Sequence, residues 1–199
     1  MLEKFSLNPE NLDDELEGYY EALMLMNIPG IPDQAEILVL DAASGDGRIS
    51  LSVNELGLRN IQLLLLDVAY SEVPTLAEAA GKRTAKKWLI CADMWKTPFI
   101  DQAVDFTVCL NVYVYNPPEI KRGLLEELTR ITKRGLVVDV GNEPIEDRFI
   151  KIWPQLKIPQ SQKYISAGKI LKDLGWHLVS SQTNDEGKTG LGLFRPSLD

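Results

Sequence analysis

The stretch ILVLDAASGDGR, residues 37–48, decides the fold class. Its first four residues are large and aliphatic, which is typical of a strand buried on both faces of a sheet. The acidic residue Asp41 ends this run, and Gly45 and Gly47 then predict a turn that leads into a helix. A strand, a glycine turn and a helix in this order indicate an open α/β sheet that binds its ligand at the carboxyl ends of its strands.

The glycine turn is acidic, and its charge distinguishes two classes of ligand. A dinucleotide presents a pyrophosphate to backbone N–H groups and a helix N-terminus, so the carboxylates of Asp41 and Asp46 would repel it. S-adenosylmethionine carries no phosphate and has a cationic ammonium and a cationic sulfonium. The turn therefore favours S-adenosylmethionine over a dinucleotide.

Short apolar runs alternate with helical periodicity along the rest of the chain, as in a parallel sheet flanked by helices. The expected strands are Ile37 to Leu40, Ile61 to Leu66, Trp88 to Cys91, Phe106 to Leu110 and Leu136 to Val140. Three helices are expected between these strands. The first follows Gly47 and has Ile49, Val53 and Leu56 on one face, the second runs from Ser71 to Arg83, and the third runs from Pro117 or Pro118 to Gly135.

The C-terminal part predicts a last helix and a hairpin. Ser166 has the pattern of an N-cap, Gly175 ends the helix, and two strands surround an NDEG turn at residues 184–187. The predicted fold is α/β and Rossmann-like, with a doubly wound, mainly parallel seven-stranded sheet, a C-terminal antiparallel hairpin and helices on both faces. We expect one domain: cap helices at 1–34, a cofactor-binding core at 35–140, an excursion covering the site at 141–165, and the last helix and hairpin at 166–199.

The charge of the chain bears on its partners. The net charge is −8 and the isoelectric point is near 4.8, which argues against a surface that neutralises phosphates and so against nucleic acid. The one basic cluster, Lys82, Arg83, Lys86 and Lys87, has the pattern of a solvated helix end.

The cysteines and the apolar runs bear on location. Cys91 and Cys109 lie in apolar runs without paired spacing, which predicts free buried thiols and no metal site. The N-terminal residues lack a basic start followed by an apolar core, and every apolar run is too short to cross a bilayer. We therefore expect a cytoplasmic protein that does not bind membranes.

The ordered motifs resemble those of the class I S-adenosylmethionine-dependent methyltransferases, of the small-molecule type that includes the ubiquinone/menaquinone methyltransferases. In that family the first motif is acidic-x-Gly-x-Gly-x-Gly. Here DAASGDG supplies Asp41, Gly45 and Gly47, and Ala43 stands where the first glycine usually stands. A small side chain is expected to permit most of the same turn while φ stays negative.

The resemblance also implies the contacts of the cofactor. Asp67 would accept both ribose hydroxyls, Asp93 would accept the adenine amine, and Met94 or Trp95 would lie against the purine ring. The motif TPFIDQAVDF and the helix LLEELTRITKRG extend the likeness. The cofactor-binding residues implied in this way are Asp41, Ala43, Ser44, Gly45, Gly47, Asp67, Val68, Asp93, Met94, Trp95 and Asn111.

Each of the three carboxylates also has a purely structural interpretation. Asp41 could cap the glycine turn, Asp67 could cap a following helix, and Asp93 could be an ordinary turn residue. Three acidic residues at three successive strand ends are hard to obtain from turn chemistry alone, so the set favours a bound cofactor.

Methyl transfer from a sulfonium requires alignment and exclusion of water more than any particular catalytic residue. Asn111 and Tyr113 are positioning candidates because they follow the fourth strand, where the transferable methyl lies in the proteins that this chain resembles. Tyr113, Tyr115, Glu143 and His177 are candidates for a general base, although a structural role is favoured for His177. We expect a small, partly apolar acceptor and a monomer or homodimer.

Three other functions remain open on the sequence. The chain could be a non-catalytic S-adenosylmethionine-binding partner protein, an amide- or base-nitrogen methyltransferase that uses Asn116-Pro117-Pro118, or an NAD(P) oxidoreductase. The Asn-Pro-Pro is better explained by a helix start, with Asn116 as N-cap, Pro117 at the first helical position and Glu119 in the first turn.

Overall fold

The computed structural model describes the chain at residues 19, 22–27, 35–45, 47–55, 58, 60–68, 86–110, 112–113, 116, 118–139, 166–183 and 189–197. The strands are β1 (Ile37–Ala42), β2 (Ile61–Asp67), β3 (Lys86–Cys91), β4 (Val104–Cys109), β5 (Thr132–Asp139), β6 (Trp176–Thr183) and β7 (Thr189–Pro196). The helices with full bounds are α2 (Arg48–Glu55), α4 (Pro118–Ile131) and α6 (Ala167–Asp173).

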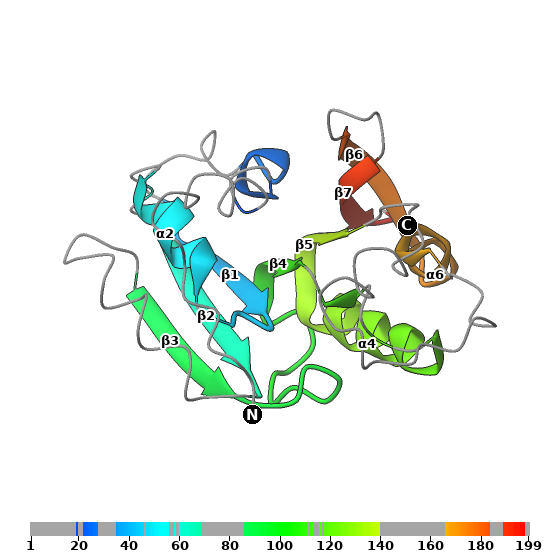
Figure 1. Cartoon of the computed structure of the whole chain (residues 1–199), viewed down its shortest axis with the longest axis horizontal. Helices are drawn as coiled ribbons and strands as arrows, with labels where there is room; N and C mark the ends of the chain where they lie inside the picture. The colour runs from blue at the N-terminus through cyan, green and yellow to red at the C-terminus, as the bar shows by residue number, and fades with distance from the viewer. Residues whose placement is uncertain are drawn as a thin grey trace, which may run out of the picture.

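The strands form one seven-stranded sheet in the order β3-β2-β1-β4-β5-β7-β6. The five strands from β3 to β5 are parallel, and β7 runs antiparallel between β5 and β6 (Figure 1). The predicted α/β, Rossmann-like sheet with its C-terminal hairpin is confirmed. Because the strand order reverses at β1, with β2 on one side and β4 on the other, the carboxyl end of β1 is the topological switch point where such sheets bind ligands.

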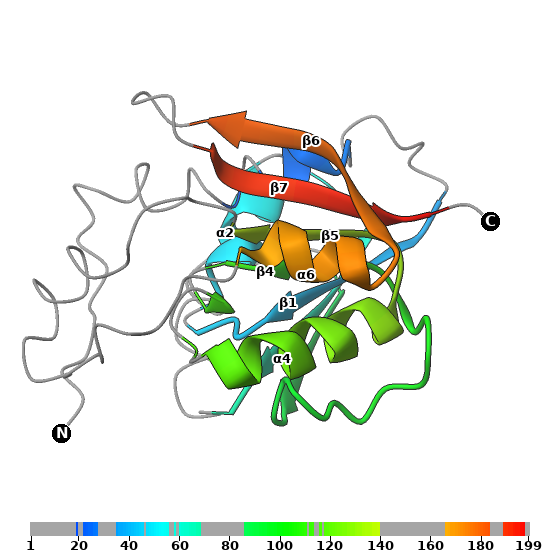
Figure 2. The same ribbon diagram turned by 90° about the vertical axis from the view of Figure 1, so that its right-hand side faces the viewer.

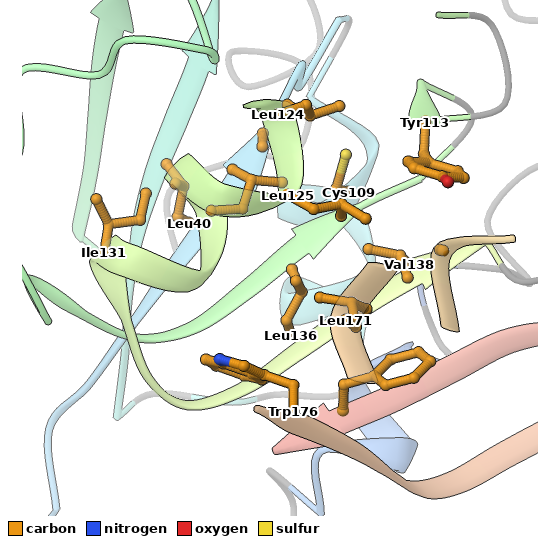
Figure 3. Close-up of a cluster of buried hydrophobic side chains, with 14 of the residues drawn as sticks. Leu40, Cys109, Tyr113, Leu124, Leu125, Ile131, Leu136, Val138, Leu171 and Trp176 are labelled. Carbon is orange, nitrogen blue, oxygen red and sulfur yellow. The ribbon is translucent and has the colours of Figure 1, made fainter. Parts of the chain in front are cut away.

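Alternate side chains of the sheet enter two separate cores. Val39 of β1 packs with Ile49 and Val53 of α2 and with the N-terminal segment at Tyr19 and Leu23. On the other face, side chains of β1, β4 and β5 pack against α4 and α6 (Figures 2 and 3). Because each strand alternates between the two cores, helices on both faces are required, as the sequence predicts.

The helix α4 ends four residues earlier than predicted. It ends at Ile131, and β5 begins at once at Thr132, so Gly135 lies inside a strand. Gly135 is opposite Phe106 of β4, and a Cβ on it would lie 2.9 Å from Leu193 Cδ1 and 3.2 Å from the Phe106 ring. The glycine therefore permits a close approach of strands and side chains and does not stop the helix.

Two further expectations are wrong in detail. Lys86 and Lys87 lie in β3, the edge strand of the sheet, and not at a helix end. The exposed Lys86 can discourage pairing with another chain. The ammonium of Lys87 is instead buried without a hydrogen-bond partner among the described residues, and this burial lowers its pKa. Cys91 is exposed, whereas Cys109 is buried; both thiols are free, as expected.

The end of the chain agrees with the sequence where it is described. The Ser166 hydroxyl accepts a hydrogen bond from the Lys169 amide at 3.3 Å, as an N-cap does. Gly175 has φ +80° directly after the C-cap of α6. The expected helix at 71–83, residue Leu56, the excursion at 141–165 and the NDEG turn lie outside the described residues.

None of the helices in the described part of the chain is long and apolar enough to cross a membrane.

Candidate functional site

The glycine turn connects β1 to α2 and is hydrogen-bonded to the carboxyl end of β2. Gly45 and Gly47 have φ +49° and +79°. The Ser44 amide donates to the Leu66 carbonyl at 3.0 Å, and the Gly45 amide donates to Oδ2 of Asp67 at 2.8 Å. The turn is thus fixed to β2, and the Asp67 carboxylate is held beside it.

Ala43 corrects the sequence expectation about this turn. Its φ is +64°, and not negative. A left-handed conformation costs an alanine about 1–2 kcal/mol because its Cβ approaches the following carbonyl oxygen. The turn therefore keeps the backbone of a glycine at this position, and the alanine is strained in it.

Replacing Ala43 with Gly is expected to relieve this strain. We expect the free energy of unfolding to rise by about 0.5–1 kcal/mol, because the gain exceeds the added entropy of the unfolded chain. Urea denaturation measures the change. Ala42→Gly is the control: Ala42 is a buried strand residue without positive φ, so this change is expected to destabilise the protein.

Carboxylates gather at the switch point on the face covered by α2. Asp41 is opposite Val108 of β4, and Val108 is opposite Val137 of β5, so Asp139, two residues further, faces the same side as Asp41. Asp41 is buried and Asp139 is partly buried. The two charges supply a negative environment of the kind that a sulfonium or ammonium group prefers.

Cys109 lies at the same end of the sheet but is not a reactive thiol. It is fully buried, and burial first, then the charges of Asp139 and Asp41, raise its pKa far above the usual value. The thiol is therefore protonated at neutral pH and belongs to the core shown in Figure 3.

The segment after β3 carries the predicted adenine contacts. Asp93 Oδ1 accepts the Trp95 amide at 3.0 Å, and its carbonyl accepts the Lys96 amide at 3.2 Å, so Asp93 closes a tight turn. Trp95 is 40% exposed, and Met94 is partly buried against the core on the face of the sheet covered by α4 and α6. The exposed Val68 lies after β2, which pairs with β3, so the segment and the Asp67 carboxylate lie at the same edge of the sheet.

The remaining candidates separate into two groups. Tyr113 is buried at one end of the core in Figure 3, with Lys121 Nζ 5.0 Å from its ring centroid. His177 is opposite Arg195, near the amino end of β5, because Phe194 is opposite Leu136. His177 therefore lies away from the carboxyl ends of the parallel strands, where the switch point is, and this position favours a structural role. The residues Asn111, Tyr115, Glu143 and Asp46 lie outside the described part.

Asn116 is held by the loop that precedes α4. The helix begins at Pro118, and the Asn116 side-chain amide donates to the Val112 carbonyl at 2.9 Å. Pro118 is one of the two helix starts that the sequence allows, and the described side-chain contact of Asn116 is a loop contact. The NH2 group, which a base- or amide-nitrogen methyltransferase would aim at its acceptor, is directed to the backbone.

We expect Asn116→Ala to spare cofactor binding and turnover while lowering the free energy of unfolding by about 1 kcal/mol, the usual value of one such hydrogen bond. Chemical denaturation and a methyl-transfer assay measure the two quantities. A loss of turnover with unchanged stability would contradict this assignment and revive the Asn-Pro-Pro alternative.

Sequence reasoning missed several residues around the site. Ser50 of α2 is fully buried beside Gly47, with its Oγ 4.0 Å from the Cβ position of that glycine. Asp139 ends β5, where its place at a strand end was the available signal. Glu127 and Arg130 bind the segment after β3, and no local pattern links residues so distant in sequence.

The described residues contain no group of three or more His, Cys, Asp or Glu side chains placed to hold a metal ion.

Comparisons with known proteins agree with this geometry. Residues 39–135 match the family model of a methyltransferase domain. The matched segment begins in β1 and ends in β5, so it contains the glycine turn, Asp67 and the segment after β3. No match was found among curated proteins.

Solved structures share the fold at low sequence identity. Magnesium protoporphyrin IX methyltransferase from Synechocystis with bound SAH has a TM-score of 0.70 and 16% identity, covering 96% of this chain and 89% of that chain. A SAM-dependent methyltransferase from Aquifex aeolicus has a TM-score of 0.59 and 20% identity, covering 94% of each chain. The 1,6-didemethyltoxoflavin-N1-methyltransferase from Burkholderia thailandensis, with bound 1,6-didemethyltoxoflavin and S-adenosylhomocysteine, has a TM-score of 0.62 and 13% identity. The match covers 96% of this chain and 85% of that chain. The first and the third of these proteins were crystallised with S-adenosylhomocysteine bound.

Proposed function

We propose that this protein transfers a methyl group from S-adenosylmethionine to a small, partly apolar acceptor. The observation that carries the proposal is the turn between β1 and α2, whose Gly45 amide donates to the Asp67 carboxylate at the end of β2 at 2.8 Å. An acidic residue held in this way at the switch point suits ribose hydroxyls and a cationic ligand, and it repels phosphates.

The buried polar atoms of the turn fit such a ligand. The hydroxyls of Ser44 and Ser50 are buried and have no hydrogen-bond partner in the structure, within its described range. Buried hydroxyls are normally paired, so a polar ligand beside the turn would satisfy them. In the proposed complex the backbone of residues 43–45 and 47 and these two hydroxyls hold the methionine portion. Asp67 would hold the ribose, and Asp93 with Trp95 would hold the adenine.

The residues of the chain would act mainly by alignment. The cofactor supplies an electrophilic methyl on a sulfonium, and its sulfur leaves as a neutral thioether. Asp41 and Asp139 would favour the cationic end of the cofactor, while the two apolar cores exclude water around it. Asn111 and Tyr113 stay our proposed positioning residues for the acceptor.

A small acceptor is supported by the fold comparisons. Two of the structural neighbours are described as acting on a magnesium porphyrin and on a toxoflavin precursor. The resemblance to the ubiquinone/menaquinone methyltransferases makes quinols and phenols the first acceptors to test.

The test is a turnover screen in which S-adenosylhomocysteine formation is measured with quinols, phenols, amines and small carboxylic acids. The proposal expects turnover with one class and none without an acceptor. If S-adenosylhomocysteine binds tightly but no acceptor of any class is methylated, the enzymatic proposal fails and the non-catalytic S-adenosylmethionine-binding protein takes its place.

A further inference from the structure

A network of charged hydrogen bonds joins α4 to the segment between β3 and β4. Oε1 of Glu127 accepts from both the amide and the hydroxyl of Thr97, at 2.8 and 2.6 Å. Arg130 donates to both carboxylate oxygens of Glu127, at 2.7 and 2.8 Å, to the Phe99 carbonyl at 2.9 Å, and to Oδ1 of Asp101 at 2.6 Å. We call these five residues the loop clamp.

Burial distinguishes the clamp from an ordinary surface ion pair. The side chains of Glu127 and Arg130 are 12% and 33% exposed, whereas those of Arg122 and Glu126, an ion pair on the same helix, are 53% and 50% exposed. Exposed pairs of the second kind contribute little. In the clamp, by contrast, Thr97 is buried and its amide has a charged acceptor, so the bonds are strong and removal of one partner leaves others unpaired.

Glu127 and Arg130 of the clamp are both ionised at neutral pH. The hydrogen bond from Arg130 is the main cause that lowers the pKa of Glu127, and that from Glu127 is the main cause that raises the pKa of Arg130. The planar guanidinium meets four acceptor oxygens on three residues at once, which a lysine ammonium on a flexible stem does not reproduce.

The clamp fixes the segment that carries the proposed adenine contacts. Thr97 follows Trp95 by two residues, and the turn closed by Asp93 ends at Lys96, immediately before Thr97. The other end of the segment is also attached to α4, because the Gln102 amide donates to the Arg130 carbonyl at 2.8 Å. The Asp93 turn is therefore placed from α4, which itself lies in the core.

We propose that Glu127 and Arg130 are positioning residues that set the selectivity of the site for adenine. The inference rests on the proposed function, because it takes Asp93 as the acceptor of the exocyclic amine. A carboxylate selects an amine over a carbonyl only if its place is fixed, since a mobile one adapts to either or turns to solvent. The clamp supplies that fixed place without touching the cofactor.

The test compares S-adenosylhomocysteine with S-inosylhomocysteine, in which a carbonyl replaces the adenine amine. Dissociation constants for both are measured by calorimetry for the wild-type protein, Arg130→Lys and the matched control Arg122→Lys. We expect the wild-type protein to prefer the adenine compound by about tenfold or more, Arg130→Lys to reduce this ratio by about fivefold, and Arg122→Lys to leave it unchanged. In an Asp93→Ala background, Arg130→Lys is expected to change the ratio no further.

A purely structural clamp would lower thermal stability and leave the ratio at its wild-type value, and that result would overturn the proposal. If Arg130→Lys does not fold, Thr97→Val, which removes one hydroxyl and keeps the backbone amide, gives the same comparison with the same expected direction. Failure of the wild-type protein to bind S-adenosylhomocysteine would overturn the proposed function, and the clamp's role in selectivity with it. Normal wild-type binding with an unchanged ratio in the variants overturns the clamp alone.

Discussion

Replacing Asp67 with Ala is expected to lower the affinity for S-adenosylhomocysteine by about 100-fold. In the proposed complex the carboxylate accepts hydrogen bonds from the ribose, and hydrogen bonds to a charged group contribute about 1.5–3 kcal/mol each. The variant also loses the 2.8 Å bond to the Gly45 amide, so the turn itself is released. Isothermal titration calorimetry with S-adenosylhomocysteine measures the change.

Two variants separate the possible causes of that loss. Asp67→Asn keeps an oxygen that can accept from Gly45 but removes the charge, so its affinity is expected to fall between those of the wild type and Asp67→Ala. Asp173→Ala removes an exposed carboxylate of α6 whose one ion-pair contact among the described residues is to Arg122, at a long 3.9 Å, and is expected to leave affinity unchanged. Equal losses in Asp67→Ala and Asp173→Ala would mean that general charge, and not this site, is responsible.

Replacing Gly135 with Ala is expected to lower the free energy of unfolding by about 1–3 kcal/mol, the usual cost of overpacking a core. The added methyl would meet the buried Leu193 at 2.9 Å and the Phe106 ring at 3.2 Å. Both neighbours are themselves enclosed in the sheet between β4, β5 and β7, so neither can move freely. Denaturation by urea, with the slope of the transition checked for two-state behaviour, measures the loss.

The control for this prediction is Gly123→Ala in α4. No heavy atom lies within 4 Å of its Cβ position, and the residue is exposed in a helix, where alanine is favoured over glycine by about 1 kcal/mol. The two glycine substitutions should therefore have opposite signs. A neutral or stabilising Gly135→Ala would contradict the close approach that we assign to this strand position.

The strands were predictable because burial on both faces leaves continuous apolar runs. Ile61–Asp67 and Ile37–Ala42 begin where the sequence predicts and extend only by polar or small residues at their ends. The end of α4 was not predictable, because the glycine that resembles a helix stop is required by Leu193, which is 58 positions away in sequence. A tertiary contact of that kind leaves no local pattern.

The carboxylates of the site could be predicted from the sequence, but the turn conformation and the hydrogen bonds that hold the site in place could not. Asp41 is the last residue but one of β1, and Asp67 ends the adjacent parallel strand β2, so the sequence places them at one edge of the sheet once the strands are known. The conformation of Ala43 was mispredicted, because a small side chain says nothing of the sign of φ. The clamp was not predicted, because Thr97 and Glu127 are 30 residues apart and neither has an unusual neighbour in the sequence.

Calorimetric titration of the wild-type protein with S-adenosylhomocysteine, NAD and NADP tests the central claim most directly. The account predicts saturable heat with one site per chain for S-adenosylhomocysteine and no binding of either dinucleotide, because the carboxylates at the glycine turn suit a cation and repel a pyrophosphate. Binding of NAD or NADP with no heat from S-adenosylhomocysteine would contradict it.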